Sequence, residues 1–142
     1  MLVLLKTYDK EGVNKRCNMK IFRGTESTWL TKINFVDDND VLIGFDWEQD
    51  YCEDFGYLIN YDECYIENGP CLETIVNLTP YYFCQEFTPH EEDSEDGGSV
   101  TFKLIAKGKP DLFFHLYNHH NGYYSHGWTL KVNGKIANGG MV

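Results

Sequence analysis

The residues with the clearest chemical potential are the carboxylates between positions 37 and 54. A D-x-E-x-D pattern begins at Asp46, and this alternation is typical of loops that offer oxygen ligands to calcium. The calcium-loop pattern then fails, because Tyr51 stands at the sixth position, where glycine is required, and Tyr57 at the twelfth, where glutamate is required. A solvated charged rim is the simplest interpretation of this cluster, and an interface for a basic partner is the functional one.

The distribution of charge along the chain favours a cationic partner. Residues 33–102 hold 18 of the 22 acidic residues and neither lysine nor arginine, whereas both flanks are basic, and the net charge is −10. Such segregation affects association and solubility rather than fold. Aromatic side chains among the carboxylates supply anchors of the kind that dominate interfaces. The predicted partner-binding residues are Asp46, Trp47, Glu48, Asp50, Tyr51, Glu53 and Asp54.

Histidines form a second group, since His115, His119, His120 and His126 lie within 12 residues. Catalytic zinc needs three such ligands that converge, but adjacent histidines in a turn usually diverge, and no helical H-x-x-x-H or C-x-x-C spacing supports them. We therefore predict no metal and no cofactor. No serine or cysteine lies in a recognisable nucleophile motif, so a small metal- or histidine-dependent hydrolase ranks last. The chain is predicted not to be an enzyme.

The segment 121–128, N-G-Y-Y-S-H-G-W, is the most distinctive peptide of the chain. Its structural interpretation is a hairpin end in which Asn-Gly supplies the turn, the aromatic residues pack across strands and His126 is partly buried. Its functional interpretation is a platform that stacks on and hydrogen-bonds a nucleotide. The residues of this alternative ligand site are His115, Asn121, Tyr123, Tyr124 and His126.

The elements that must position these residues are mostly strands. Alternating apolar and polar residues predict a mainly β fold, either an antiparallel β-sandwich or a strongly curved sheet, with at most one or two short helices. In the first part of the chain, strands are expected at residues 18–23, 28–36 and 41–47. A tight turn at 37–40 is expected between the last two.

The last third of the chain has the clearest alternation. Residues 100–104, 112–117 and 124–132 alternate in hydrophobicity, which predicts a three-stranded antiparallel meander. Asn133 and Gly134 predict one more tight turn, after which residues 136–142 fold back onto the preceding strand.

The middle of the chain is ambiguous. Residues 55–78 fit either strands or short helices, because both spacings occur there. Residues 87–98 hold five acids and no large apolar residue after Phe87, which predicts a solvated and mobile acidic loop.

One domain covering residues 1–142 is expected from the length and from the absence of repeats or a linker. The five cysteines are odd in number and lack C-x-x-C spacing, which favours reduced thiols. The apolar stretch at the start is too short for a signal sequence or a membrane span. We therefore expect a protein of the cytoplasm, with no membrane association.

Two short motifs resemble those of an uncharacterised family of small acidic proteins from phages and gut bacteria. The motifs are Q-D-Y-C-E-D at residues 49–54 and N-G-Y-Y-S at residues 121–125, and the resemblance covers residues 41–128. The chain departs from the family pattern at Tyr51, where the family has a cysteine, and at His120, where it has a serine. These changes weaken any function of a cysteine pair. The resemblance implies a phage or mobile-element setting in a bacterial host cell.

These features together predict a non-enzymatic binding protein that inhibits a host defence protein, in the manner of an anti-CRISPR protein. Its acidic surface would imitate nucleic acid, or otherwise meet a basic surface on a defence or toxin protein, without binding nucleic acid directly. The alternative is a ligand-sequestering protein that captures a nucleotide immune signal near residues 121–128.

Overall fold

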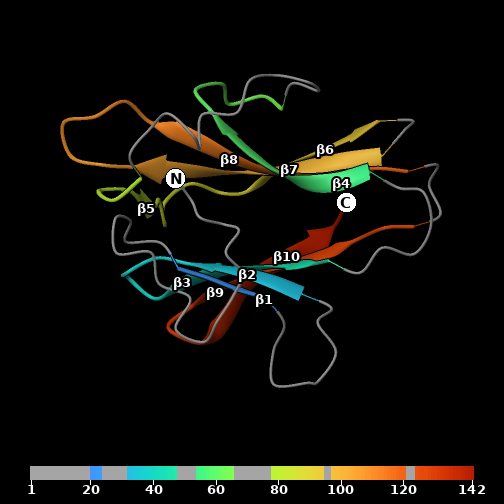
Figure 1. Ribbon diagram of the computed structural model, residues 1–142, viewed down its shortest axis with the longest axis horizontal. Coiled ribbons are helices and arrows are strands. Elements are labelled where there is room, and N and C mark those ends of the chain that lie inside the picture. The colour runs from blue at the N-terminus through green and yellow to red at the C-terminus, as the bar shows by residue number, and fades with distance from the viewer. Residues whose placement is uncertain (1–19, 24–31, 48–53, 66–77, 95–96, 121–123) are drawn as a thin grey trace.

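The computed structural model describes residues 20–23, 32–47, 54–65, 78–94, 97–120 and 124–142. In this part of the chain there are ten strands and no helix (Figure 1), so none that is long and apolar enough to cross a membrane. The strands are β1 (Lys20–Arg23), β2 (Lys32–Val36), β3 (Val41–Asp46), β4 (Asp54–Asn60), β5 (Tyr82–Phe83), β6 (His90–Ser94), β7 (Gly97–Ile105), β8 (Leu112–His119), β9 (Gly127–Val132) and β10 (Lys135–Met141).

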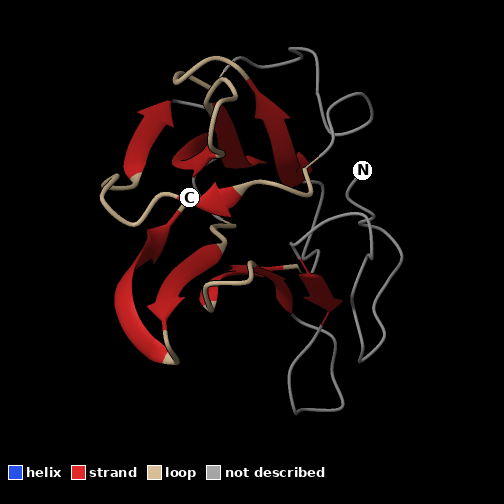
Figure 2. Cartoon of the chain, turned by 90° about the vertical axis from the view of Figure 1, so that its left-hand side faces the viewer, coloured by secondary structure: helices blue, strands red, loops and turns tan. Residues whose placement is uncertain are grey.

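The strands form two antiparallel sheets that face each other. Sheet A has the order β1-β2-β3-β9-β10, and sheet B has the order β4-β8-β7-β5, with β6 also paired to β7. The two layers lie one above the other in Figure 1, and Figure 2 shows them as strands joined by loops. The predicted mainly β, antiparallel sandwich is confirmed.

The core between the sheets follows from alternation along each strand. Phe35, Ile43 and Phe45 of sheet A have no exposed surface, and neither do Phe114 and Leu116 of sheet B. Phe35 meets Phe114 edge to face, with ring centroids 4.8 Å apart, which is a favoured aromatic geometry. Apolar burial therefore holds one sheet against the other.

Both predicted tight turns are present. Residues 37–40 join β2 to β3, and Asn133 and Gly134 join β9 to β10. Asn133 and Gly134 have φ angles of 53° and 80°, which is the left-handed backbone that a two-residue hairpin turn of this hand requires. Residues 135–141 then fold back on β9 as expected.

The predicted C-terminal meander is wrong in its third strand. β7 pairs with β8, but β9 crosses to sheet A, where it lies between β3 and β10. The second edge of β8 is taken by β4 over seven residue pairs, from Asp54 opposite His119 to Asn60 opposite Phe113. Alternation within a strand reveals which face is buried, but it does not reveal which strand is the partner. The same pairing shows that residues 55–60, part of the region 55–78 that fitted either a strand or a helix, form a strand.

The acidic segment 87–98, predicted to be a loop, contains strand residues instead. Residues 90–94 form β6, which pairs with the first part of β7, and Gly97 and Gly98 belong to β7 itself. Ladder hydrogen bonds on one side hold the segment, and charged side chains are well tolerated on an edge strand. In addition, Glu91 accepts a 2.9 Å hydrogen bond from the indole N–H of Trp128, across the gap between the sheets.

Asp37 is a buried carboxylate, although the sequence placed it in a solvated rim. Its Oδ1 accepts hydrogen bonds from the backbone N–H groups of Asn39 (2.9 Å) and Val41 (3.0 Å), and its Oδ2 accepts one from Phe83 (2.9 Å). The side chain thus shapes the β2–β3 turn and ties it to β5 of the other sheet. Three backbone donors replace the water that a buried carboxylate loses.

We predict that Asp37→Asn lowers the free energy of unfolding by about 2–3 kcal/mol, because an amide NH₂ group would face one of the three backbone donors. The measurement is urea denaturation followed by tryptophan fluorescence. Asp40→Asn is the matched control, since it removes one charge from the same turn, its side chain is exposed, and asparagine tolerates the φ of 61° at this position. The control should change stability by less than about 0.5 kcal/mol, and equal losses in both variants would contradict the prediction.

Candidate functional site

The outer face of sheet B, the face turned away from sheet A, carries histidine, tyrosine and hydroxyl side chains in neighbouring strands. On β8 the alternate residues Phe114 and Leu116 enter the core, so His115, Tyr117 and His119 project from the opposite face. The strand register sets their neighbours in rows across the sheet. One row across the sheet consists of Glu92, Ser99, Tyr117 and Gly56. The next row consists of His90, Thr101, His115 and Leu58. On the other side of the Tyr117 row, Asp54 of β4 lies opposite His119 of β8.

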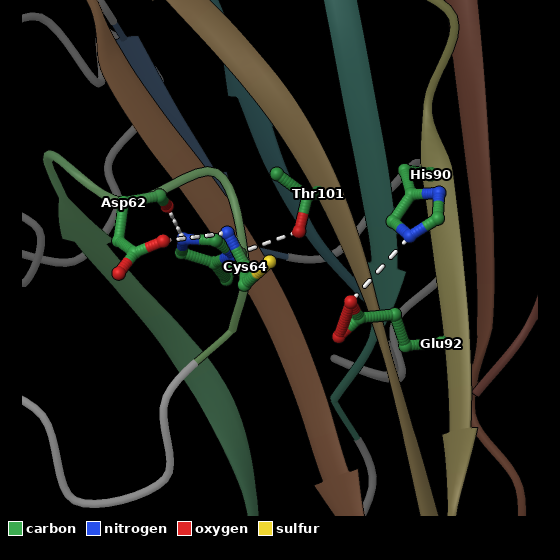
Figure 3. A network of polar contacts seen from close by, with 6 residues as sticks. Asp62, Cys64, His90, Glu92 and Thr101 are labelled. Carbon is green, nitrogen blue, oxygen red and sulfur yellow. Dashed lines mark hydrogen bonds and ion pairs between the residues drawn. The ribbon is translucent and has the colours of Figure 1, made fainter.

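The segment 61–65 after β4 is fastened to this face. Asn60 Oδ1 accepts a hydrogen bond from the N–H of Asp62, and Asp62 Oδ1 accepts one from the N–H of Cys64, both at 3.0 Å. These are two successive turns of the kind that asparagine and aspartate side chains stabilise. Figure 3 shows Asp62 and Cys64 of this segment near Thr101, with His90 and Glu92 further along the face.

His115 is the buried centre of the network that holds this segment. Its Nε2 lies 2.8 Å from Asn60 Oδ1 and 3.0 Å from the carbonyl oxygen of Asp62, and its Nδ1 lies 2.7 Å from the hydroxyl of Thr101. Because both partners of Nε2 are acceptors, we assign the ring hydrogen to Nε2, and Nδ1 accepts from Thr101. Burial lowers the pKa of His115 from 6.5 to about 4, against the opposing influence of the Asp62 carbonyl and charge.

The hydroxyl of Thr101, the imidazole of His115 and the amide of Asn60 are connected in the order of a nucleophile, a general base and a group that orients the base. Thr101 and His115, however, have no exposed surface, so no substrate can reach the hydroxyl. Since the imidazole bonds the segment 61–65 at Asp62, the network serves to hold that segment against the sheet.

Three half-buried rings form an aromatic cluster, defined here as Tyr65, Tyr117 and His119. The rings of Tyr65 and Tyr117 are stacked, with centroids 5.5 Å apart and planes at 24°, and His119 tilts against both. The hydroxyl of Tyr65 lies 2.8 Å from Nε2 of His119. Tyr117 lies over Gly56 of β4, where a Cβ atom would stand only 2.9 Å from its hydroxyl oxygen. The missing side chain at Gly56 therefore makes room for the cluster.

Four carboxylates lie on the same face as the aromatic cluster or in the segment that carries Tyr65. Asp54 at the start of β4 is exposed, as are Asp62 and Glu63 in the segment that carries Tyr65. Glu92 on β6 faces outward, 3.4 Å from a histidine nitrogen of His90 (Figure 3). We call Asp54, Asp62, Glu63 and Glu92 the acidic rim. Among the residues that the structure describes, none of the four forms an ion pair with lysine or arginine.

Of the predicted partner-binding residues, the structure describes Asp46, Trp47 and Asp54, while Glu48, Asp50, Tyr51 and Glu53 lie outside the described residues. Asp46 accepts a 2.9 Å hydrogen bond from the N–H of Gly127 and pairs with Lys32 at 3.1 Å, so its carboxylate joins neighbouring strands. The ring of Trp47 packs edge to face against Phe45 and Phe55. Asp54 alone of these three belongs to the acidic rim.

The alternative ligand residues are not brought together. His115 lies on the outer face of sheet B, whereas the buried ring of His126 packs against Phe45 and Phe55 on the core side. Nδ1 of His126 donates a 2.7 Å hydrogen bond to the carbonyl of Asp46, which is a structural role. Tyr124 is half-buried, and Asn121 and Tyr123 lie outside the described residues.

Sequence reasoning missed Tyr65, Tyr117 and Thr101 as members of a site. The positions of Tyr117 and His119 were available from the alternation of β8, which sends odd-numbered residues outward once Phe114 and Leu116 are assigned to the core. Thr101 follows from the register with β8. Tyr65 carries no comparable signal, because it reaches the face from a loop.

The fold and this face define the protein as an all-β sandwich with an acidic and aromatic outer surface on one sheet. Comparison of the chain with protein-family models, with curated proteins and with solved structures finds no match. Within the described ranges no group of three or more histidine, cysteine or acidic side chains is arranged to hold a metal ion. Cys64 and Cys84, the two described cysteines, are free thiols.

We predict that His115 makes stability depend on pH. In the unfolded chain its imidazole takes up a proton near the ordinary pKa of 6.5, whereas in the folded protein it stays neutral until the pH falls to about 4. Between pH 6.5 and pH 4 the unfolded state binds more protons than the folded state does. The contribution of neutral His115 to the free energy of unfolding is therefore complete above pH 6.5 and is lost as the pH falls towards 4. The lowered pKa corresponds to about 3 kcal/mol.

The test measures the free energy of unfolding by urea denaturation between pH 7 and pH 4.5. It compares the wild type with His115→Gln, whose side chain cannot titrate. The variant is expected to be less stable at pH 7, but its stability should fall by about 2–3 kcal/mol less over this range. Parallel pH profiles for the two proteins would show that His115 titrates normally.

Proposed function

We propose that this protein is a non-enzymatic binding protein that recognises a basic protein surface with the outer face of sheet B. The observation that carries the proposal is the acidic rim around the aromatic cluster. Its carboxylates come from β4, from the segment 61–65 and from β6, so segments distant in sequence add their charge on one face. A surface of one sign attracts an oppositely charged partner and accelerates association.

Most of the described lysine and arginine residues lie elsewhere in the fold. Sheet A carries Lys20, Arg23, Lys32, Lys131 and Lys135, and the turn between β7 and β8 carries Lys107 and Lys109. Lys103 is the exception, since it lies on the outer face of sheet B, where its ammonium group pairs with Asp111 at 3.3 Å. The segregation of charge along the sequence therefore has a partial counterpart in space, which supports an acidic character for the outer face of sheet B.

The partner that fits this chemistry best is a basic surface that otherwise holds nucleic acid. Carboxylates on such a face compete with phosphates for lysine and arginine side chains. With the resemblance to phage and gut-bacterial proteins, this supports a counter-defence role in the cytoplasm of a bacterial host, against a nucleic-acid-guided nuclease or a basic toxin. Half-buried aromatic rings beside the carboxylates would anchor the contact.

The test compares two variants that each remove two charges. Asp54→Asn/Glu63→Gln changes the acidic rim, and Asp38→Asn/Asp40→Asn changes exposed carboxylates of the β2–β3 turn in sheet A. Binding is measured by biolayer interferometry against purified bacterial nucleases and nucleic-acid-binding toxins, at low and high salt, with duplex DNA as competitor. We expect the rim variant to bind roughly tenfold more weakly than the control variant.

Binding to a panel member should also weaken with salt and be displaced by duplex DNA, because the contact is electrostatic and the surface is shared. The proposal is contradicted by equal binding of the two variants, by binding that does not respond to salt, or by the absence of binding to every member of the panel.

A further inference from the structure

We infer that the aromatic cluster of Tyr65, Tyr117 and His119 binds the guanidinium group of an arginine side chain from the basic partner. This inference rests on the proposed function and names the group that the acidic face recognises. It adds a stacking surface, which favours arginine over lysine, to the charge of the acidic rim.

The geometry of the cluster suits a planar group. Tyr117 is seated on β4 over Gly56, and Tyr65 stacks on it at 5.5 Å with its hydroxyl 2.8 Å from Nε2 of His119. The segment that carries Tyr65 is fastened through the buried His115. The rings are thus held in place before any partner arrives, which lowers the entropy lost on binding.

The charges around the cluster select a cation. Asp62 and Glu63 lie in the segment that carries Tyr65, Asp54 lies opposite His119, and Glu92 lies in the row of Tyr117. Aromatic faces attract cations, and nearby carboxylates add to this attraction. A nucleotide would also stack on such rings, but its phosphates would meet the acidic rim.

Arginine fits this arrangement better than lysine does. Its guanidinium is planar and weakly hydrated, so it can stack on a tyrosine ring while its N–H groups reach carboxylates at the ring's edge. A lysine ammonium is a compact, strongly hydrated point charge without a plane to stack. A preference for arginine therefore distinguishes a stacked site from a merely acidic one.

The experiment titrates the whole chain with two acetylated peptides, Gly-Arg-Gly-Arg-Gly and Gly-Lys-Gly-Lys-Gly, and follows the protein by NMR. The wild type should bind the arginine peptide roughly three- to tenfold more tightly, with shifts in the ring resonances of Tyr65, Tyr117 and His119. Tyr65→Leu should abolish this preference, and the matched variant Tyr65→Phe, which keeps the ring and loses only the hydroxyl, should retain it. Methylguanidinium, the free form of the recognised group, should shift the same resonances at high concentration. The arginine peptide should bind more tightly than methylguanidinium if the natural ligand is an arginine of a protein.

The outcomes separate this inference from the proposed function. If both peptides bind equally and the rim variant Asp54→Asn/Glu63→Gln weakens both, the arginine site is overturned while the acidic interface stands. If the arginine preference is lost in Tyr65→Leu but the rim variant binds as wild type, the acidic interface is contradicted and the ring site stands. The wild type alone also tests the inference. If the arginine peptide shifts only resonances of residues outside the cluster, the inference is overturned, so the test does not depend on whether Tyr65→Leu folds.

Discussion

The carboxylate of Asp37 is a polar contact that fixes the position of one sheet relative to the other, within a sandwich that apolar burial holds together. It lies in the turn between β2 and β3 of sheet A, and it accepts the N–H of Phe83 from β5 of sheet B. A buried carboxylate must have donors for its oxygens, since the loss of hydration is otherwise far too costly. The three backbone N–H groups at this position meet that need only when both the turn and β5 are in place. One side chain thus links local turn geometry to the packing of the sandwich.

Two more acids of residues 33–102, the part of the chain without lysine or arginine, have a similar structural role. Glu91 of sheet B accepts from the indole of Trp128 in sheet A, and Asp46 accepts from Gly127 on the neighbouring strand. Two groups can therefore be distinguished among the described acids of this segment. Asp37, Asp46 and Glu91 hold strands together, while the acidic rim of Asp54, Asp62, Glu63 and Glu92 faces outward. Charge along the sequence did not separate these groups, because the separation depends on which backbone donors the fold brings within reach.

Local patterns predicted the parts of the fold that local forces determine. The turns at 37–40 and at Asn133 were readable because each needs specific residues at specific backbone angles. The sequence did not predict that β9 belongs to sheet A. Its predicted partner β8 and its actual partner β3 are both strands of alternating hydrophobicity, so the pattern does not distinguish them. The pairing of β6 was hidden by its charge, because an edge strand with one hydrogen-bonded side does not need apolar residues. The same limit applies to the predicted ligand site. His115 and His126 are close in sequence, but His115 lies on the outer face of sheet B, whereas the ring of His126 is buried between the sheets.

The acidic side chains of β4 and β6 can be explained without a binding partner, because charge on an edge strand prevents pairing with other chains. That explanation accounts for Asp54 and Glu92, which lie on opposite edges of sheet B. It does not account for Tyr65, which is held over the middle of the sheet by a loop that His115 fastens from below. Edge protection gains nothing from stacked rings on a face, and the core gains little from rings that stay half-exposed. The conjunction of this stack with the acidic rim is what favours a binding surface over a merely protected sheet.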